Sequence, residues 1–398
     1  MRKIVLYDIP DVHANLLPLS FTRPIADFRV GITTIREKWE RMMPGEYCYA
    51  TVDFLRAKFQ SDLSGMNLYI MSNVFPSCEL VSAIETLKEG EALCKDGNLI
   101  AFYGTIESLN SKMYVERCYE GEVVAINYLF DVFLLNGRMI KQDFEELTKG
   151  RKSAKLSSTN ILIGNAYDEQ GNPMLFIEES ASVEGAILNV SNGPIYIGAN
   201  SEVMEGSCVR GPMSLGEHSH VNMGSKIYGD TTIGPWCKVG GELNNAVFFG
   251  YSNKAHDGFV GNAVIGEWCN IGAGTNASNL KNDYSKIRIW NYPQHTFMRT
   301  DLQFCGLIMG DHSKAGINCM FNTATVLGVG VNIHGAGFPR TFIPSFTEGS
   351  AVGGFTDVQL KKFFEIAGRA MARRGKVLTE TDYEIFETIY EIASKYKY

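Results

Sequence analysis

A six-residue repeat in the second half of the chain restricts its fold more than any other feature. Aliphatic residues fall at every sixth position for eight steps, namely Ile197, Val203, Val209, Leu215, Val221, Ile227, Ile233 and Val239. A period of six fits neither an amphipathic helix nor an alternating strand. It fits one short strand and one corner in every six residues. Three such units close a triangular coil whose strands pair in parallel with those of the next coil.

The repeat continues beyond these eight steps. After a slip of two residues the frame resumes at Val247, is interrupted at Asn253 and continues through Phe259, Ile265 and Ile271. A third run holds Met309, Ala315, Phe321, Leu327 and Ile333. Of the 40 glycines, 23 lie in residues 181–335, where tight corners need small residues. The pattern resembles the left-handed parallel β-helix of hexapeptide-repeat proteins, and we expect that fold over residues 176–340.

One segment, residues 276–302, lacks the repeat and is polar and aromatic. It must therefore leave the prism between two coils. Long ordered loops on a rigid scaffold are often functional, and a loop that protects the edge of the prism is the alternative. Both interpretations stay open at the level of sequence.

The two ends of the chain lack the six-residue repeat and predict other structures. Residues 1–150 alternate candidate strands and helices, which predicts an α/β domain. Residues 151–175 are expected to be a linker, and residues 341–398 a C-terminal helical extension that caps the prism. The expected elements are strands at 4–7, 68–72 and 123–126, helices at 32–42 and 80–87, an apolar run of undecided type at 129–135, and two helices within 357–396, the second starting near Thr379–Asp382.

Composition excludes several classes of function. The net charge of −7 does not favour nucleic-acid binding, which needs a clustered basic field. The longest apolar runs are too short for a transmembrane helix, and Asp8 interrupts what would be a signal peptide, so we expect a cytoplasmic protein without a membrane partner. The nine cysteines form no C-x-x-C pair and are expected to be free thiols.

The densest polar sequence lies inside the repeat, at residues 253–262, 270–275 and 279–283. This region contains His256, and histidine is the side chain that most often acts as a general base near neutral pH. The alternative is a corner histidine that bonds a backbone carbonyl. We expect no metal site, because the seven histidines show no spacing typical of the zinc-binding hexapeptide helices.

The segment from Asn253 to Asp283, with His256 and the block Gly272-Ala273-Gly274-Thr275, resembles the acetyltransferase domain of the GlmU family. That family combines glucosamine-1-phosphate acetyltransferase with N-acetylglucosamine-1-phosphate uridylyltransferase activity. The match is closest to archaeal and Bacteroidetes-type variants. Residues 17–31 and 35–39 resemble the Bacteroidetes type specifically, so the resemblance covers nearly the whole chain.

The resemblance implies roles for individual residues. His256 falls on the catalytic base, which would take a proton from the 2-amino group of an amino-sugar phosphate as the amine attacks acetyl-CoA. The resemblance also implies acetyl-CoA as co-substrate and a homotrimer, with acetyl-CoA bound between subunits. The other implied contacts are Asn270 and Asn279 to the amino sugar and acetyl group, Lys281, Lys286 and Lys226 to the sugar phosphate, and Arg340 to acetyl-CoA.

Two departures from the family concern the substrate. Asn244 or Asn245 stands near the position of a lysine, and Phe259 replaces an aromatic hydroxyl.

The front domain departs further, because the stretch that should hold a glycine-rich phosphate loop, residues 8–23, contains no glycine. Arg23, Arg29 and Lys38 remain as candidate phosphate contacts. Asp131 resembles part of a conserved segment of archaeal relatives, with a loop or cap residue as the alternative.

Three hypotheses follow. The first is an amino-sugar-phosphate acetyltransferase with possible uridylyl transfer from UTP, which would need Mg²⁺ only if the front domain is active. The second is a sugar-1-phosphate nucleotidyltransferase whose β-helix is only an oligomerisation or regulatory platform. The third is a sugar-nucleotide-binding assembly protein without catalysis.

Overall fold

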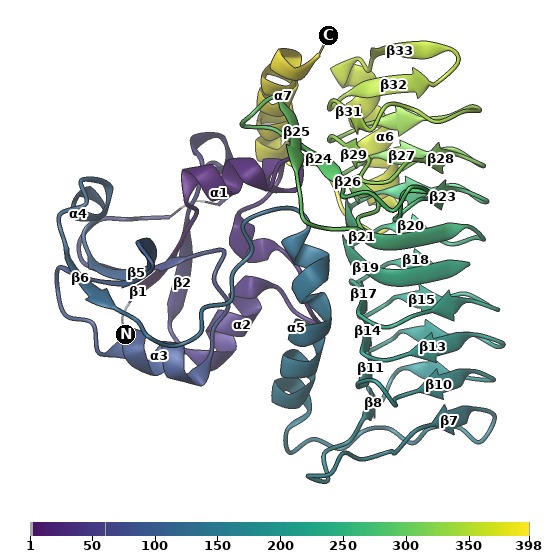
Figure 1. The fold of residues 1–398 in the computed structure, drawn as a ribbon, viewed down its shortest axis with the longest axis horizontal. Coiled ribbons are helices and arrows are strands. Elements are labelled where there is room, and N and C mark those ends of the chain that lie inside the picture. The colour runs from purple at the N-terminus through teal and green to yellow at the C-terminus, as the bar shows by residue number, and fades with distance from the viewer. Residues whose placement is uncertain (1–2, 60, 398) are drawn as a thin grey trace.

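The computed structural model describes residues 3–59 and 61–397. An α/β domain lies beside a tall stack of short strands, and two helices, α6 and α7, lie alongside the coils near the C-terminal end of that stack (Figure 1). The expected fold class is confirmed: an N-terminal α/β domain, a parallel β-helix and C-terminal helices.

The N-terminal domain is built on a six-stranded mixed sheet in the order β2-β1-β3-β5-β4-β6. The first three of these strands are parallel, and β5 is antiparallel to both its neighbours. All five residues of β3 are buried, which fits its place inside the sheet. The strands are β1 Lys3–Tyr7, β2 Glu46–Ala50, β3 Asn67–Met71, β4 Glu91–Lys95, β5 Asn98–Gly104 and β6 Val115–Cys118.

Five α-helices accompany this sheet, namely α1 Pro10–Asn15, α2 Ile35–Met42, α3 Cys78–Glu85, α4 Ile106–Asn110 and α5 Asp131–Thr148. The predicted strands at 4–7 and 68–72 and the predicted helices at 32–42 and 80–87 are confirmed, with shifts at their ends. Helix α2 begins at Ile35 because Thr34 and Glu37 form a capping box. The undecided run at 129–135 falls mostly within α5.

The strand predicted at 123–126 is wrong. This segment makes only an isolated antiparallel bridge between Val74 and Ala125. Its apolar residues pack against the core without joining the sheet. Burial of an apolar run does not by itself require a strand.

The β-helix has three faces. The first face runs from β9 to β32, with β33 antiparallel at its end. The second runs from β7 to β28 and the third from β8 to β31. Strands β19 and β21 are nine residues long and belong to both the second and third faces.

The strands of the first face are β9 Ser182–Val183, β12 Glu202–Val203, β15 His220–Val221, β18 Lys238–Val239, β20 Asn253–Lys254, β22 Asn270–Ile271, β27 Lys314–Ala315, β30 Asn332–Ile333, β32 Thr347–Ser350 and β33 Gly354–Asp357. Those of the second are β7 Ile161–Ile163, β10 Ile187–Asn189, β13 Cys208–Arg210, β16 Lys226–Ile227, β19 Glu242–Gly250, β21 Phe259–Glu267, β23 Asn276–Ala277 and β28 Met320–Phe321. Those that belong to the third alone are β8 Leu175–Ile177, β11 Ile195–Ile197, β14 Met213–Leu215, β17 Thr231–Ile233, β26 Ile308–Met309, β29 Val326–Leu327 and β31 Phe342–Ile343.

The register between coils matches the six-residue repeat. Val203 pairs with Val221 and Val221 with Val239, so 18 residues make one coil here. The aliphatic residues of the repeat are buried in one core inside the prism. Strand β7 pairs with β10, so part of the expected linker, residues 151–175, stacks as a rung of the second face.

The first two residues of the segment 276–302 still form a rung of the second face as β23. The remainder, residues 278–302, leaves the prism and contains a hairpin of β24 Arg288–Asn291 and β25 Thr296–Arg299. Asn291 Nδ2 donates to Asn15 Oδ1 over 3.0 Å. The buried ring of Tyr292 contacts the rings of Phe21 and Phe342 edge to face. The hairpin therefore joins the N-terminal domain to the far end of the β-helix (Figure 1), which favours the packing interpretation of this segment.

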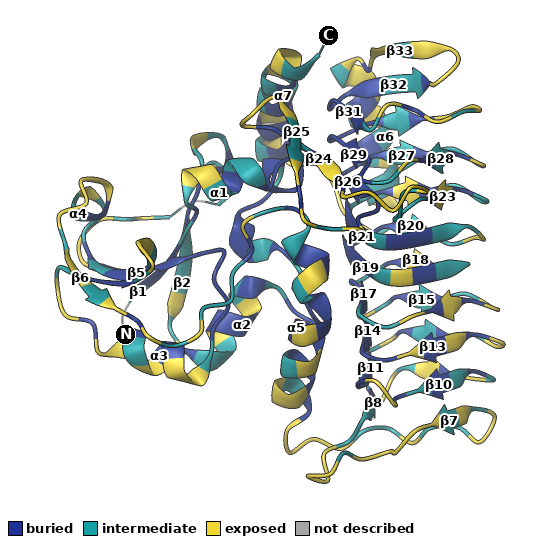
Figure 2. Ribbon diagram, viewed as in Figure 1, coloured by how far each residue is buried: buried dark blue, intermediate teal, exposed yellow. Residues whose placement is uncertain are grey.

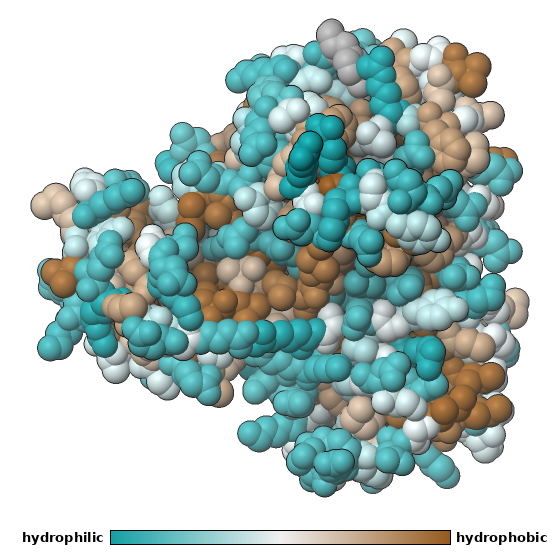
Figure 3. Space-filling model, in the orientation of Figure 1, coloured by the Kyte–Doolittle hydropathy of each residue, from teal (hydrophilic) through white to brown (hydrophobic). Residues whose placement is uncertain are grey.

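Helix α5 packs along the third face, whose strands are largely buried (Figure 2). Asn136 Nδ2 on α5 donates to the carbonyl of Asp230 over 2.7 Å, and Thr232 Oγ1 donates to the carbonyl of Gly31 over 2.9 Å. Apolar side chains gather between the two parts on the face seen in Figure 3. One hydrophobic core therefore spans the α/β domain, the third face and the C-terminal helices.

The two predicted C-terminal helices are confirmed as α6 Leu360–Ala372 and α7 Glu380–Ala393. Thr379 and Asp382 form the capping box of α7. Asp382 also accepts from Lys58 Nζ over 2.8 Å, which ties α7 to the N-terminal domain. No helix in the described part of the chain is long and apolar enough to cross a membrane.

A buried ion pair joins the two large parts. The Arg23 guanidinium donates to Asp311 Oδ2 and lies 3.5 Å from Glu267 Oε2, and Thr22 Oγ1 donates to Asp311 over 2.7 Å. Arg23 and Asp311 are both nearly inaccessible to solvent. A buried pair is costly to break, because removal of one partner leaves the other charge unpaired.

We expect Arg23→Met to lower the free energy of unfolding by about 3 kcal/mol or more, because Asp311 loses its counter-charge. Chemical denaturation measures this loss. Arg138→Met is the matched control: it breaks an exposed pair with Glu122 and should cost less than about 1 kcal/mol. The double variant Arg23→Met/Asp311→Asn should recover much of the loss. Equal, small effects in both single variants would contradict this account.

His13 in α1 is also buried, and its Nε2 has no hydrogen-bond partner. Burial disfavours the imidazolium and lowers the pKa of His13 to about 4. The folded state therefore binds its proton less readily than the unfolded chain does.

Because this folded pKa is depressed, we expect the contribution of His13 to stability to be complete above about pH 6.5 and to be lost as the pH falls to about 4. The loss should reach at most about 3 kcal/mol. Unfolding of wild type and His13→Leu, measured from pH 4 to 7, isolates it, and the variant should show the shallower fall. Parallel pH profiles would count against a neutral, buried His13.

Candidate functional site

His256 lies on an exposed corner of the β-helix, between β20 on the first face and β21 on the second. A cavity of about 580 Å³ opens at this corner. Its lining comes from the same corner in successive coils, namely Met223, Gly240, Gly241, Ala255, His256, Asp257, Ala273, Gly274, Ile317 and Asn318. Because the coils are in register, they place one histidine in a column of mostly small and polar residues, with Met223 and Ile317 as its large apolar members.

The backbone at this corner is tightly packed. Gly274 N donates to the carbonyl of Asp257 over 2.9 Å, and Glu242 N donates to the carbonyl of Gly258 over 3.1 Å. Gly258 has φ +119°, and a Cβ there would lie 2.0 Å from the carbonyl oxygen of Thr275. Only glycine fits this position.

The His256 ring makes no hydrogen bond with any described residue of the chain. The alternative predicted from the sequence, a hydrogen bond from the imidazole to a backbone carbonyl, is therefore not seen among the described residues. An exposed imidazole in a cavity can accept a proton from a bound ligand.

Among the predicted sugar-phosphate contacts, Lys226 lies on the same side of the prism as His256. It pairs in register with Glu242, which pairs with Phe259. Two coil spacings separate Lys226 from Phe259, or about 10 Å. Lys226 is exposed, so its amine is accessible to a ligand near this corner.

The two predicted asparagine contacts lie elsewhere. Asn279 Nδ2 donates to Asn262 Oδ1 over 2.8 Å at the opposite end of the second face, where Asn262 forms the corner. Asn270 lies on the first face, in register with Asn253 and Lys314. Each is therefore about one strand length away from the His256 corner.

The remaining predicted contacts lie in loops. Lys281 Nζ donates to the carbonyl of Lys286 over 3.2 Å, and Lys286 Nζ donates to the carbonyl of Asp301. Arg340 is exposed in the loop between β30 and β31. A single chain therefore brings Lys226 toward His256 and leaves Asn279, Lys281 and Lys286 on another part of its surface.

A second cavity, of about 380 Å³, lies between the first face and α6. Four cations line it, Lys314, Arg369, Arg373 and Arg374, together with the stacked rings of Tyr251 and Trp268. Its lining contains no carboxylate. Asn253 Oδ1 and Arg374 Nε are buried there without a hydrogen-bond partner. This chemistry suits a phosphorylated ligand.

These arginines were not among the residues predicted from the sequence. A signal was present, because Arg373 and Arg374 follow Arg369 by four and five residues in a region predicted to be helical, which can place them near one another. Without the fold, nothing indicated that this helix would pack across β20, β22 and β27.

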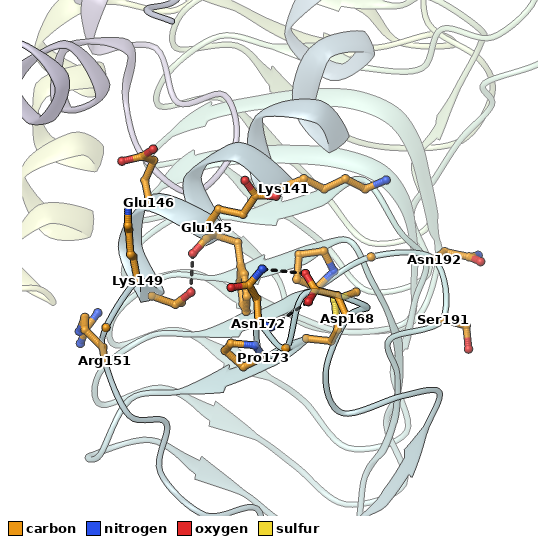
Figure 4. Close-up of a pocket in the computed structure, with 17 residues that line it drawn as sticks. Lys141, Glu145, Glu146, Lys149, Arg151, Asp168, Asn172, Pro173, Ser191 and Asn192 are labelled. Atoms are coloured by element: carbon orange, nitrogen blue, oxygen red, sulfur yellow. Dashed lines mark hydrogen bonds between the residues drawn. The ribbon is translucent and has the colours of Figure 1, made fainter. Parts of the chain in front are cut away.

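A third cavity, of about 710 Å³, lies between the C-terminal end of α5 and the first coils (Figure 4). Its charges are mixed, with Lys141 and Lys149 beside Glu145 and Glu146. Asp168 in this cavity accepts from Asn172 Nδ2 over 2.9 Å. Its position at the start of the prism separates it from His256 by several coils.

The three candidate phosphate contacts of the N-terminal domain are engaged inside the protein. Arg23 pairs with Asp311. Arg29 donates to the carbonyl of Phe249 over 3.1 Å, and buried Lys38 pairs with Asp143. The cavity beside Arg23 holds only about 60 Å³, which is too small for a nucleotide.

Asp8 and Asp131 are likewise engaged. Asp8 is buried and accepts from Thr51 Oγ1 over 2.6 Å, and burial raises its pKa to about 6. Asp131 accepts from the backbone amide of Asn127 over 2.7 Å. No group of acidic, histidine or cysteine side chains among residues 3–59 and 61–397 is arranged to hold a metal ion.

Comparisons with known proteins bear on each part of the chain. No curated protein matches it. Solved structures that align with it include a hexapeptide transferase family protein from Anaplasma phagocytophilum, at 13% identity over 56% of this chain and 88% of the other, with a TM-score of 0.21. The acetyltransferase domain of PglB from Neisseria gonorrhoeae, in complex with acetyl coenzyme A, aligns at 13% identity over 90% of this chain and 99% of the other, with a TM-score of 0.18. Arabidopsis UDP-N-acetylglucosamine acyltransferase aligns at 13% identity over 61% and 92%, with a TM-score of 0.20. Residues 4–152, which form the N-terminal domain, match the model of the sugar nucleotidyl transferase family.

Proposed function

We propose that this chain transfers an acetyl group from acetyl-CoA to the 2-amino group of an amino-sugar phosphate of the glucosamine-1-phosphate type. The observation that carries the proposal is His256, an exposed histidine with a ring free of partners in the described chain, at a cavity formed by stacked corners. Its sequence surroundings resemble those of the acetyltransferase family named above.

In the proposed reaction His256 is the general base. It accepts a proton from the amine of the sugar as nitrogen attacks the thioester carbon. Coenzyme A leaves as the thiolate, and the new bond is an amide. The backbone amides of His256 and Asp257 donate to no carbonyl of the described residues, so they are available to stabilise the developing oxyanion.

The phosphates of the acyl donor would bind in the arginine-lined cavity. Asn253 and Asn270 line that cavity, and Ala255 and Ala273, two and three residues further along, line the cavity of His256. Three residues of a strand span about 10 Å, within reach of an extended donor. Arg340 remains a further proposed contact of acetyl-CoA.

We propose a homotrimer, in which a neighbouring copy completes the site. Lys226 alone among the proposed sugar-phosphate contacts approaches the His256 corner within one chain. Met223 and Ile317 flank the corner with 71% and 70% of their surfaces exposed, an apolar rim that suits contact with another subunit. A triangular prism also favours threefold packing.

The family match of residues 4–152 favours a second activity, uridylyl transfer from UTP. Against it, Arg23, Arg29 and Lys38 are already paired within the protein, so other residues would have to bind the triphosphate. Asp8 and Asp131 accept hydrogen bonds from the protein, and they do not fit a Mg²⁺ site. Acetyl transfer is therefore the principal function that we propose, and release of pyrophosphate from UTP and N-acetylglucosamine-1-phosphate tests the second.

We expect free CoA to be released from acetyl-CoA in the presence of glucosamine-1-phosphate, and His256→Ala to reduce kcat roughly 10²- to 10⁴-fold, because the base is lost. A thiol assay measures the release. His334→Ala is the matched control: His334 is also exposed and follows β30 on the same face, and its loss should leave kcat unchanged. Equal rates for wild type and His256→Ala would exclude His256 as the base.

We further expect Arg373→Ala to raise KM for acetyl-CoA about tenfold or more, because a charge-assisted hydrogen bond to phosphate is lost. KM for the sugar phosphate should stay the same. Lys361→Ala is the control, since Lys361 is exposed on the same helix outside the cavity. If both variants gave the wild-type KM, the donor phosphates would bind elsewhere.

A further inference from the structure

A lysine occupies a position inside the prism that other coils fill with an aliphatic residue. The inward column of the first face holds Val203, Val221, Val239, Lys254, Ile271, Ala315 and Ile333. Lys254 pairs directly with Val239 and is only 1% exposed. The strand register of the first face therefore places a lysine in the core of the coil that carries His256.

The amine of Lys254 donates hydrogen bonds to two backbone carbonyls. Lys254 Nζ donates to the carbonyl of Gly240 over 3.1 Å and also to the carbonyl of His256. The carbonyl of Lys254 in turn accepts from the amide of Gly240 over 2.7 Å. These bonds tie the corner at His256 to the corner of the preceding coil.

Burial of this amine has a cost that packing alone does not explain. It makes no salt bridge among the described residues. Burial lowers its pKa to about 8, and the charge of Asp257 offsets part of that shift. A buried charge without a contacting carboxylate is unfavourable, and a valine or isoleucine would fill the column, as it does at Val239 and Ile271. The corner after Ile271, residues 272–275, is as long as the corner after Lys254, residues 255–258, although its column residue is aliphatic.

We propose that Lys254 is a positioning residue for His256. By holding the backbone carbonyl of His256, its amine keeps the corner in one conformation and presents the imidazole at a constant place in the cavity. This inference rests on the proposed acetyl transfer, and Lys254 itself touches neither substrate. A displaced base of this kind lowers kcat and leaves substrate binding nearly intact.

The test is Lys254→Met, which keeps an unbranched side chain of similar length and suits an apolar column. We expect kcat for acetyl transfer to fall about 10- to 100-fold, KM values to change less than about threefold, and the melting temperature to be unchanged or higher. Amide hydrogen exchange of Gly240, Glu242 and Gly274, which donate to the carbonyls of Lys254, Gly258 and Asp257, should become faster. Ile271→Met, in the same column one coil away, is the matched control and should alter none of these.

A double variant separates positioning from general stability. If Lys254 acts through His256, Lys254→Met should cause no further loss of kcat in the His256→Ala background. If Lys254→Met does not fold, Lys254→Gln takes its place. Glutamine keeps a hydrogen-bond donor of shorter reach, so we expect kcat to fall, but by less than in Lys254→Met.

Unchanged kcat and unchanged exchange at Gly240, Glu242 and Gly274 in an active, folded variant would overturn the inference. An additional loss in the His256→Ala background would overturn it as well. Wild-type protein without acetyl transfer would instead contradict the proposed function. The exchange measurement needs no activity, so it still shows whether the amine holds the corner.

Discussion

The parallel stacking of coils is the constraint on which the rest of the structure depends. Apart from β19 and β21, the strands of the prism are two to four residues long, and neighbouring coils hold them in place, with the repeat aliphatics buried inside. Stacking fixes the register, and the register brings equivalent corners into one column. The cavity at His256 follows from that column, because its lining residues come from successive coils. A site built in this way needs no long loop to assemble it.

The contact between the α/β domain and the prism uses charges that a nucleotide-binding domain would be expected to direct outward. Arg23 meets Asp311 across the contact, and Arg29 donates to the carbonyl of Phe249. Each of these contacts helps to fix the orientation of the α/β domain relative to the prism. Each also engages an arginine that could otherwise bind a phosphate. Two of the residues predicted to contact phosphate, Arg23 and Arg29, thus form part of the joint between the α/β domain and the prism.

The sequence predicted the fold well where a local rule decides the structure. The period of six predicted the prism, and the Thr379–Asp382 pair predicted the start of α7. It failed at 123–126, where an extended apolar segment packs on the core with a single bridge from Ala125. It could locate His256 from motif and chemistry. It could not show that Arg23 would meet a residue 288 positions away, or that Arg373 would face β22, because those contacts depend on how distant elements pack.

The central claim, direct acetyl transfer to a sugar amine at the His256 corner, is tested most directly by following the acetyl carbon. Acetyl-CoA labelled with ¹³C at the carbonyl is incubated with glucosamine-1-phosphate, and the product is examined by NMR. The account predicts a ¹³C amide on the 2-nitrogen of the sugar with the wild-type protein, and only a trace of it with His256→Ala over the same time. A labelled ester, no labelled sugar, or equal amide yields from the two proteins would contradict it.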